Sequence, residues 1–210
     1  QTFIQLLDKN FDDRDMVKKY LEKIGSSAQR MAKLIRGVLD YSRLNDYEEK
    51  QLETDLNLIL EQVKTDFELV IKEKGAVIIS NPLPVVKGMP LQLNQLFSNF
   101  ISNSLKFAVG RPEIRISSRL VSGREIMPLS GVQRPDPYYE IVFEDNGIGF
   151  DPKFGDQIFT MFRRLHGHQD FPGTGIGLAL CKKIAENHKG FIQAEGNPDK
   201  GASFRVYLPV

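Results

Sequence analysis

The longest regular pattern of apolar positions lies near the start of the chain. Between residues 15 and 44, apolar side chains recur every seven residues, and a second series follows four positions after the first. Tyr20, Leu34 and Tyr41 widen this stripe to about three residues in seven, which is typical of a helix in a bundle rather than of a narrow two-stranded coiled coil. The two series are Val17, Ile24, Met31 and Val38, and Leu21, Ala28 and Ile35.

A short apolar run stands before this long helix. The segment Phe3–Leu7 has helical spacing, and the polar stretch from Asp8 to Arg14 indicates a tight turn. We therefore expect the tail of one helix, a turn and a long antiparallel return helix. A lone hairpin would leave its apolar stripe in water, so the pattern predicts a homodimer in which two hairpins form a four-helix bundle.

A polar segment without periodicity, residues 45–51, separates this hairpin from the rest of the chain. We therefore expect two domains, a helical hairpin at 1–46 and a mixed α/β domain at 47–210. In the second domain Asp55 can cap a helix whose apolar positions run to Ile71, and Gly75 can end it. Further helices are expected at 91–107 and 177–187, strands at 76–80, 113–121, 138–144, 191–195 and 202–208, and loops at 82–90 and 122–137.

The helix expected at 91–107 is rich in asparagine and serine. Each of these residues costs up to about 0.7 kcal/mol relative to alanine in a helix, and glutamate or lysine would solvate a plain surface more cheaply. Asn99, Asn103 and Lys106 have the spacing i, i+4 and i+7, so they share one side of the helix. Amide oxygens can bind Mg²⁺ and a lysine can meet phosphate, while a plain polar helix face is the alternative interpretation.

Two glycine-rich segments follow, and each is a weak signal when taken alone. Asp145–Gly149 (DNGIG) comes directly after an expected strand. Its glycines let the backbone approach a ligand closely, and its aspartate can accept a hydrogen bond from an exocyclic amine such as that of adenine. A turn that simply ends the strand is the alternative interpretation. Gly173–Leu178 (GTGIGL) opens a helix, whose first backbone N–H groups can bind an anion. Because no strand immediately precedes it and no Gly-Lys-Ser/Thr follows, it is neither a Rossmann fingerprint nor a phosphate loop.

Composition excludes several other classes of protein. The chain has 28 basic and 27 acidic residues and a net charge of +1, which argues against a nucleic-acid binder. No apolar run approaches the roughly 18 residues of a membrane span and no leader opens the chain, so we expect no direct membrane contact by this segment. Cys181 is the single cysteine and cannot form an internal disulfide, so we expect a reducing, cytoplasmic compartment.

Taken in order, these motifs resemble those of the sensor histidine kinases of two-component systems. An asparagine box at Asn99–Phe107, a first glycine box at Asp145–Gly149, a phenylalanine box at Ile158–Phe162 and a second glycine box at Gly173–Gly177 follow the order of the Bergerat-type ATPases. The resemblance covers nearly the whole chain. It implies an α+β fold, with half of a dimeric four-helix bundle followed by an α/β sandwich of the Bergerat ATP-binding type.

The resemblance also implies a role for each matched position. Asn103 is expected to bind Mg²⁺, and Asn99 and Lys106 are the expected catalytic residues. Asp145 is expected to accept a hydrogen bond from the adenine amine of ATP, and residues 163–172 to form a lid over the nucleotide. The positions expected to contact the nucleotide are these together with Phe107, Gly147, Gly149, Arg164, Gly173, Thr174, Gly175, Gly177 and Leu178.

The resemblance implies a reaction in which the γ-phosphoryl group of ATP is transferred to a histidine and then to the receiver domain of a response regulator. Two features of the sequence bear on this reaction. In hydrolysing relatives, the position four before the magnesium asparagine is a glutamate that activates water. Here it is Asn99, which cannot act as a general base, so we expect slow hydrolysis. None of the three histidines (His166, His168 and His188) fits the acceptor position, so we expect a fragment that does not phosphorylate itself.

Other interpretations remain open. A non-catalytic, nucleotide-gated interaction module would carry the same boxes, and so would a serine kinase of the anti-sigma-factor type. The hairpin at residues 1–44 argues against the serine kinase, because those relatives lack one. His166 and His168 make an incomplete zinc site and are expected on the lid surface. Cys181 has helical spacing with apolar neighbours, so a buried core thiol is expected.

Overall fold

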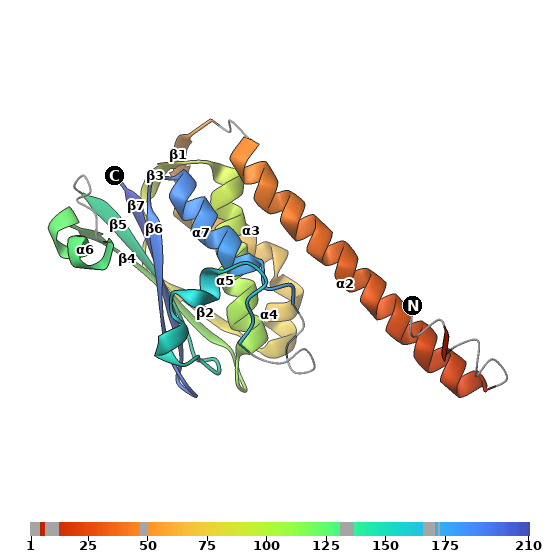
Figure 1. The fold of residues 1–210 in the computed structure, drawn as a ribbon. Coiled ribbons are helices and arrows are strands. Elements are labelled where there is room, and N and C mark those ends of the chain that lie inside the picture. The colour runs from red at the N-terminus through yellow and green to blue at the C-terminus, as the bar shows by residue number, and fades with distance from the viewer. Residues whose placement is uncertain (1–4, 7–12, 47–49, 131–136, 166–170, 172) are drawn as a thin grey trace. The chain divides into compact units, whose positions relative to one another are not determined.

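The chain divides into two compact units, Gln1–Arg43 and Leu44–Val210. The structure, a computed structural model, describes residues 5–6, 13–46, 50–130, 137–165, 171 and 173–210 (Figure 1). Parts of the predicted turn at 8–14, linker at 45–51, loop at 122–137 and lid at 163–172 lie outside these residues, and so do His166 and His168. Within the described residues, the helices are too short or too polar to span a membrane.

The described part of the first unit is helical. α2 (Arg14–Asp46) begins after Asp13, whose Oδ1 accepts two backbone N–H groups of the first turn at 3.1 Å each, and it extends two residues into the predicted linker. Of the helix predicted before it, residues 5–6 are described, and they are helical. The apolar stripe of α2 is partly exposed in the single chain: Met31 and Ile35 are at 58% and 61% of their full exposure, whereas Tyr20 is buried. An apolar face left in water in this way is suited to a protein contact.

The second unit is built on a five-stranded sheet with the order β2-β4-β5-β7-β6. β2 runs parallel to β4, and all other neighbours in this sheet are antiparallel. All five strands were predicted, to within two residues at each end. They are β2 (Val77–Ser80), β4 (Glu113–Val121), β5 (Tyr138–Asp145), β6 (Phe191–Asn197) and β7 (Gly201–Pro209).

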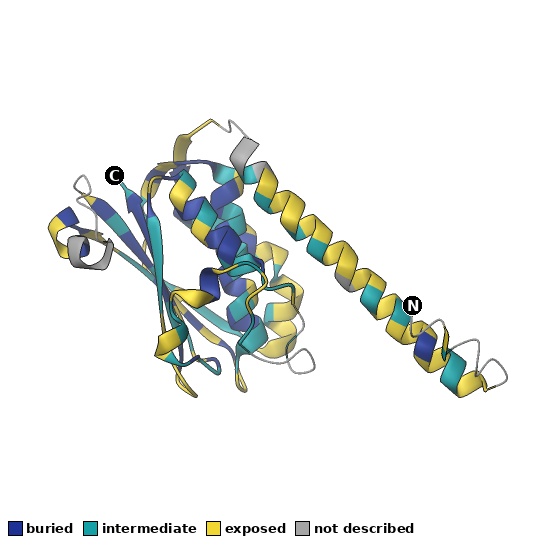
Figure 2. Cartoon of the chain, in the orientation of Figure 1, coloured by how far each residue is buried: buried dark blue, intermediate teal, exposed yellow. Residues whose placement is uncertain are grey.

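Three helices cover one face of this sheet (Figure 1): α3 (Leu56–Asp66), α5 (Pro90–Phe107) and α7 (Gly177–Asn187). α5 lies between the other two and contacts both. Its Phe97 and Phe100 rings pack against Phe143 of β5, with ring centroids 4.9 and 4.7 Å apart. The side of α5 that faces the sheet is buried (Figure 2), and this packing fixes the direction in which its asparagine side points.

Two details of the first half of this unit differ from the predictions, and two others are confirmed. β1 (Leu52–Asp55) and β3 (Val85–Gly88) form an antiparallel ribbon where no strands were expected, because each is four residues long and its partner is distant in sequence. The single helix predicted from Asp55 to Gly75 is interrupted at Phe67, so that α4 (Glu68–Lys74) follows α3. The two predicted caps are confirmed: Asp55 accepts a hydrogen bond from the N–H of Asn57, and Gly75 has φ 59°.

The predicted loop at 122–137 is wrong in its first part, which forms α6 (Gly123–Ser130). Ile126 of this helix is buried together with Val121, Tyr138 and Tyr207, which lie on the face of the sheet opposite to α5. Large aromatic side chains on that face need a cover, and α6 provides it. The glycines and prolines of the segment concealed this from sequence reasoning, since they are more typical of loops.

Candidate functional site

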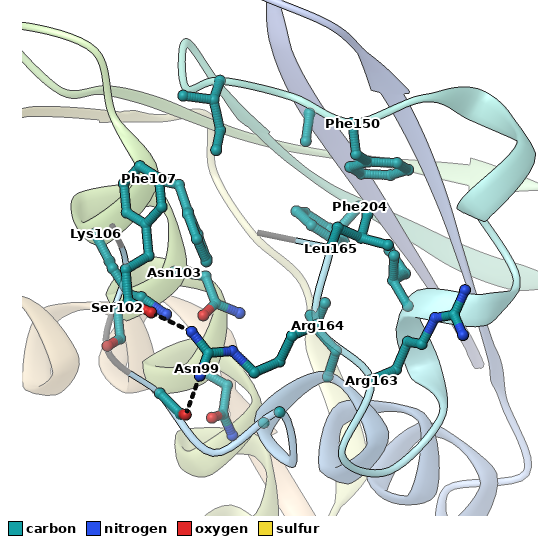
Figure 3. A pocket seen from close by; sticks show the side chains of 18 of the residues that line it. Asn99, Ser102, Asn103, Lys106, Phe107, Phe150, Arg163, Arg164, Leu165 and Phe204 are labelled. Atoms are coloured by element: carbon teal, nitrogen blue, oxygen red, sulfur yellow. Dashed lines mark hydrogen bonds between the residues drawn. The ribbon is translucent and has the colours of Figure 1, made fainter. Parts of the chain in front are cut away.

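A cavity of about 290 Å³ lies in the second unit between α5, the end of β5 and the segment before α7 (Figure 3). Side chains from all four boxes line it, although they are far apart in sequence. Every predicted site residue except Gly147 is part of its wall: Asn99, Asn103, Lys106, Phe107, Asp145, Gly149, Arg164, Gly173, Thr174, Gly175, Gly177 and Leu178. The structure thus brings the amides, the aspartate and the glycines together around one space.

Outside the predicted lid, sequence reasoning assigned no individual role to six residues of the wall, one of which is Ile158 of the phenylalanine box. Ser102 and Ile148 lie inside the boxes, and Phe150 follows directly after the first glycine box. Ala202 and Phe204 come from β7, and only the strand register brings them to the site, because β7 pairs Ala202 with Asp145. Nothing in the local sequence of β7 signals this pairing.

The two asparagines of α5 are held differently. The Nδ2 of Asn99 donates to the carbonyl oxygen of Gln95 at 2.9 Å, which fixes the amide, and its Oδ1 faces Gly177. A Cβ on Gly177 would lie only 2.8 Å from that oxygen. Asn103 is half-buried and its amide points into the cavity (Figure 3); within the described residues it has no hydrogen-bond partner. Asn103 is therefore available to a ligand.

Cationic side chains gather at the same wall. Burial, together with the charge of Arg164, lowers the pKa of Lys106, whose Nζ lies 4.1 Å from the centroid of the Phe107 ring. The guanidinium of Arg164 donates to the carbonyl oxygens of Phe171 at 2.6 Å and Gly173 at 3.3 Å, drawn as dashed lines in Figure 3. In the described part of the wall Asp145 is the only carboxylate, so the cavity suits an anion.

Asp145 is fixed at the end of β5 by three donors. Its Oδ1 accepts the N–H groups of Gly147 at 2.9 Å and Ala202 at 3.3 Å, and its Oδ2 accepts the hydroxyl of Ser104 at 3.0 Å. Burial raises the pKa of this carboxyl, and the three hydrogen bonds oppose that rise. A buried, oriented carboxylate of this kind can accept a hydrogen bond from an amine on a ligand.

The two glycines after Asp145 have different roles. Gly147 lies outside the wall of the cavity, but its N–H holds the carboxylate, and a Cβ here would lie 2.8 Å from the carbonyl oxygen of Phe107. Gly149 lines the cavity with φ 61°, and its Cα lies against the backbone of Asn197 and Gly201. The prediction that Gly147 contacts a ligand therefore corresponds, in this structure, to a position that supports Asp145.

The phenylalanine box and the second glycine box meet beside the cavity. The predicted box at 158–162 begins inside the short 3₁₀ turn η2 (Gln157–Phe159), which follows another such turn, η1 (Pro152–Phe154). Phe162 is exposed with φ 63°, and its N–H donates to the carbonyl oxygen of Gly175 at 2.8 Å. In the part of the chain that the structure describes, no side chain caps the N-terminus of α7, and its first N–H groups can therefore bind an anion.

Two predictions outside the cavity are also decided. Cys181 is fully buried, as expected, and burial raises the pKa of its thiol. His188 ends α7 and is buried, and its Nε2 accepts the N–H of Met89 at 2.9 Å. Within the described residues there is no group of three or more histidine, cysteine, aspartate or glutamate side chains that could hold a metal ion.

Comparison with known families and proteins agrees with this geometry. Residues 88–210 match the model of the family described as histidine kinase-, DNA gyrase B-, and HSP90-like ATPase, and residues 1–46 match the His Kinase A (phospho-acceptor) domain. The phytochrome-like protein Cph1 of Synechocystis sp. is 31% identical over 99% of the chain, and cyanobacterial phytochrome A of Nostoc sp. is 34% identical over 99%. The chain spans 26% of the length of each of these two relatives.

Solved structures share the fold. Full-length ShkA in complex with AMPPNP has a TM-score of 0.68 and 23% identity over 91% of this chain and 38% of its own. Histidine kinase ThkA in complex with the response regulator protein TrrA has a TM-score of 0.66 and 21% identity over 99% of this chain and 55% of its own. With the ATPase family matched over more than half of its length, the chain belongs to the histidine kinase-, DNA gyrase B- and HSP90-like ATPases, and its two matched domains are those of a sensor histidine kinase.

Proposed function

We propose that the cavity binds Mg-ATP and that the chain is the nucleotide-binding core of a protein histidine kinase. Its reaction is transfer of the γ-phosphoryl group of ATP to a histidine, followed by relay to an aspartate on the receiver domain of a response regulator. The observation that carries this proposal is the convergence of Asn103, Asp145 and the segment 173–178 on one cavity. The amide can bind the metal, the carboxylate can bind the adenine base, and the helix N–H groups can bind the phosphates.

The side chains of the wall fit the parts of the nucleotide. Mg²⁺, when bound, neutralises phosphate charge, and the unpartnered amide of Asn103 can supply one oxygen to it. Lys106 and Arg164 are cations that can meet phosphate oxygens, and Asp145 can accept the adenine amine. Apolar surface for the base and ribose comes from Phe107, Ile148, Phe150 and Phe204.

Asn99 bears on whether ATP is transferred or hydrolysed. Its side-chain amide cannot act as a general base at neutral pH, and its Nδ2 already donates a hydrogen bond to the carbonyl oxygen of Gln95. The wall offers no other carboxylate than Asp145 in the described residues. The described part of the site therefore offers no base for water, which favours a protein acceptor over rapid hydrolysis.

The acceptor and the partner follow from residues 1–46. This segment matches the phospho-acceptor domain but contains no histidine, so the acceptor histidine belongs to another part of the whole kinase. The exposed part of the α2 stripe supports a homodimer of hairpins. The family match over residues 1–46 supports a domain boundary at 46/47, three residues after the division between the two compact units. The match at 1–46 also disfavours the serine kinase alternative. We infer a cytoplasmic location, where ATP and response regulators occur.

Calorimetric titration of the 210-residue chain with ATP, with and without Mg²⁺, tests the proposal. Mg²⁺ should tighten ATP binding by the wild-type chain, and Asn103→Leu should abolish that gain while leaving metal-free binding nearly unchanged. Lys87→Ala, a change on the exposed surface of β3, serves as the control and should behave as the wild type. A wild-type chain that binds no adenine nucleotide would refute the proposal. Equal loss of ATP binding with and without Mg²⁺ in Asn103→Leu would refute the metal role.

A further inference from the structure

The hydroxyl of Ser104 reaches Asp145 from the buried side of α5. Its Oγ donates to Oδ2 of Asp145 at 3.0 Å, and Ser104 itself is only 2% exposed. Ser104 is not part of the cavity wall, so it can influence a ligand only through the carboxylate. We propose that Ser104 is a positioning residue that keeps Asp145 an acceptor and thereby selects purines with an exocyclic amine; this inference rests on the function proposed above.

The choice of serine at this position calls for a reason. Serine costs about 0.5 kcal/mol relative to alanine in a helix interior, and alanine would fit a buried site equally well. A serine hydroxyl within a helix commonly bonds back to a carbonyl one turn earlier. Ser104 instead bonds a carboxylate 41 residues away in the sequence. The hydroxyl therefore serves Asp145 rather than its own helix.

The three donors divide the carboxylate into two unlike oxygens. Oδ1 receives both backbone N–H groups, from Gly147 and Ala202, and each carboxylate oxygen offers about two acceptor sites. Among the described residues Oδ2 accepts only the hydroxyl of Ser104, so one of its acceptor sites stays open to a ligand. A ligand amine would therefore meet Oδ2, the oxygen that Ser104 orients.

Protonation of Asp145 would reverse its preference, because a neutral carboxyl can donate to a ring carbonyl such as that of hypoxanthine. Burial raises the pKa of Asp145, and the bonds from Gly147, Ser104 and Ala202 oppose this rise. The charged side chains of the same cavity are Lys106, Arg163 and Arg164. Those of the hollow on the opposite side of the strand ends are Glu113, Arg115, Glu144, Glu195, Lys200 and Arg205. No hydrogen bond or ion pair joins any of these described side chains to Asp145, so removal of the Ser104 hydroxyl should act on it directly.

The test compares ADP with inosine diphosphate, which carries a carbonyl in place of the amine. The ratio of their two affinities, measured by calorimetry on the 210-residue chain from pH 5 to 8.5, cancels the titration of the phosphates and of the cations that bind them. The wild type should prefer ADP at high pH and lose this preference as Asp145 takes up a proton. Because the Ser104 bond lowers the pKa, Ser104→Ala should lose the preference at a pH about one unit higher.

Two further variants complete the test. Ser104→Thr keeps the hydroxyl and should follow the wild-type curve. Ser98→Ala removes another serine from the same helix, one whose Oγ lies 3.5 Å from Asn94 Oδ1, and should also follow it. A Ser104→Ala curve that coincides with the wild type, or a loss of affinity for both nucleotides at every pH, would overturn the inference. A wild-type chain that binds neither nucleotide would instead refute the proposed function, and this inference with it.

Discussion

Replacement of Gly149 by alanine tests whether backbone really closes tightly behind the cavity. A Cβ at this position would overlap the carbonyl oxygen of Asn197 and lie 2.6 Å from that of Gly201. The two oxygens belong to the last residue of β6 and the first of β7. The turn between these strands is tied back by a hydrogen bond from the N–H of Asp199 to the carbonyl of Ile148 at 2.8 Å. Neither oxygen can move aside as the end of a flexible side chain could.

Gly110 provides a matched control, because it shares the backbone strain without the clash. Its φ is 71° against 61° at Gly149, and an added Cβ would meet nothing within 4 Å. An L-residue in this conformation costs about 1–2 kcal/mol. Forcing extra atoms into packed surroundings adds about 1–3 kcal/mol. Gly110→Ala should therefore lose about 1–2 kcal/mol, and Gly149→Ala about 2–5 kcal/mol.

Urea denaturation of the two variants beside the wild type measures this difference. A domain stability of about 5–15 kcal/mol leaves both variants folded enough to study. Since Gly149 lines the cavity, its variant should also bind ADP more weakly, while Gly110→Ala should bind it normally. Equal loss of unfolding free energy in the two variants would show that the Asn197 carbonyl does not confine Gly149, and the reasoning would fail.

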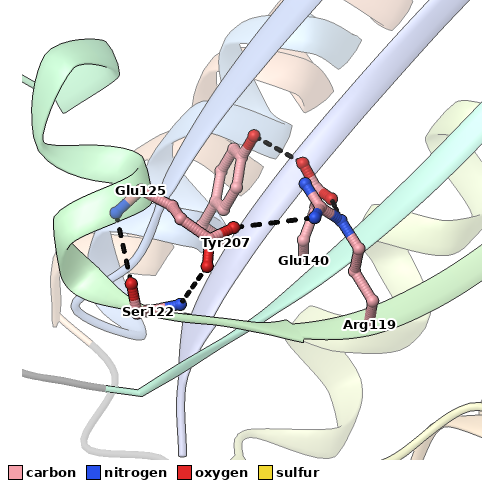
Figure 4. Close-up of polar contacts among 5 residues, drawn as sticks. All are labelled: Arg119, Ser122, Glu125, Glu140 and Tyr207. Atoms are coloured by element: carbon pink, nitrogen blue, oxygen red, sulfur yellow. Dashed lines mark hydrogen bonds and ion pairs between the residues drawn. The ribbon is translucent and has the colours of Figure 1, made fainter.

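Three other changes probe the site and its support. Asn99→Glu places a carboxylate where ATP-hydrolysing relatives have one, and we expect the rate of phosphate release to rise, by up to about 10²-fold if water is well placed; an unchanged rate would count against the role given to Asn99. Lys106→Met should weaken ADP binding about tenfold or more, with adenosine binding almost unaffected, because the lost interaction is with phosphate; equal losses for the two ligands would contradict this. Glu140→Gln should lower the unfolding free energy at pH 7 by about 1–3 kcal/mol. The reason is that buried Glu140 accepts a hydrogen bond from the Tyr207 hydroxyl at 2.7 Å and forms an ion pair with the largely exposed Arg119 (Figure 4). Burial alone would raise the pKa of Glu140, but these partners lower it overall. The difference in unfolding free energy between wild type and variant should therefore be complete above the ordinary pKa of 4.5 and vanish as the pH falls through the lowered pKa of the folded protein. Urea titrations at pH 7 and pH 3 that show the same difference would be the contrary result.

The asparagine side of α5 could be predicted because helical spacing is local. Asn99, Asn103 and Lys106 share a side wherever the helix lies, and the unfavourable helix propensity of the two asparagines indicated a function. The two glycine boxes could be found in the sequence, but their positions in space could not be predicted, because how they come together depends on how the sheet folds. The strand register that sets Ala202 opposite Asp145 is a long-range property, and no local pattern in β7 encodes it.

The errors have a common physical cause. α6 was predicted as loop because its glycine and proline content outweighed a short apolar pattern, yet Tyr138 and Tyr207 on the outer face of the sheet require a cover. Tertiary burial decided the structure there, and propensity did not. Gly147 illustrates the same limit at the site: sequence reasoning marked it as a special position, and only the structure shows that its N–H holds Asp145. Its contact with a ligand stays a prediction.

The charges of the cavity indicate why neutral amides stand at positions 99 and 103. Lys106, Arg163 and Arg164 bring three positive charges to the described wall, and Asp145 brings one negative charge. A triphosphate with about four negative charges and one Mg²⁺ would leave this set close to neutral. A carboxylate at either amide position would add a negative charge beside the phosphates and, at position 99, also a base for water. Neutral amides therefore allow ATP to be held without supplying the group that would hydrolyse it, which is what a kinase awaiting a protein acceptor requires.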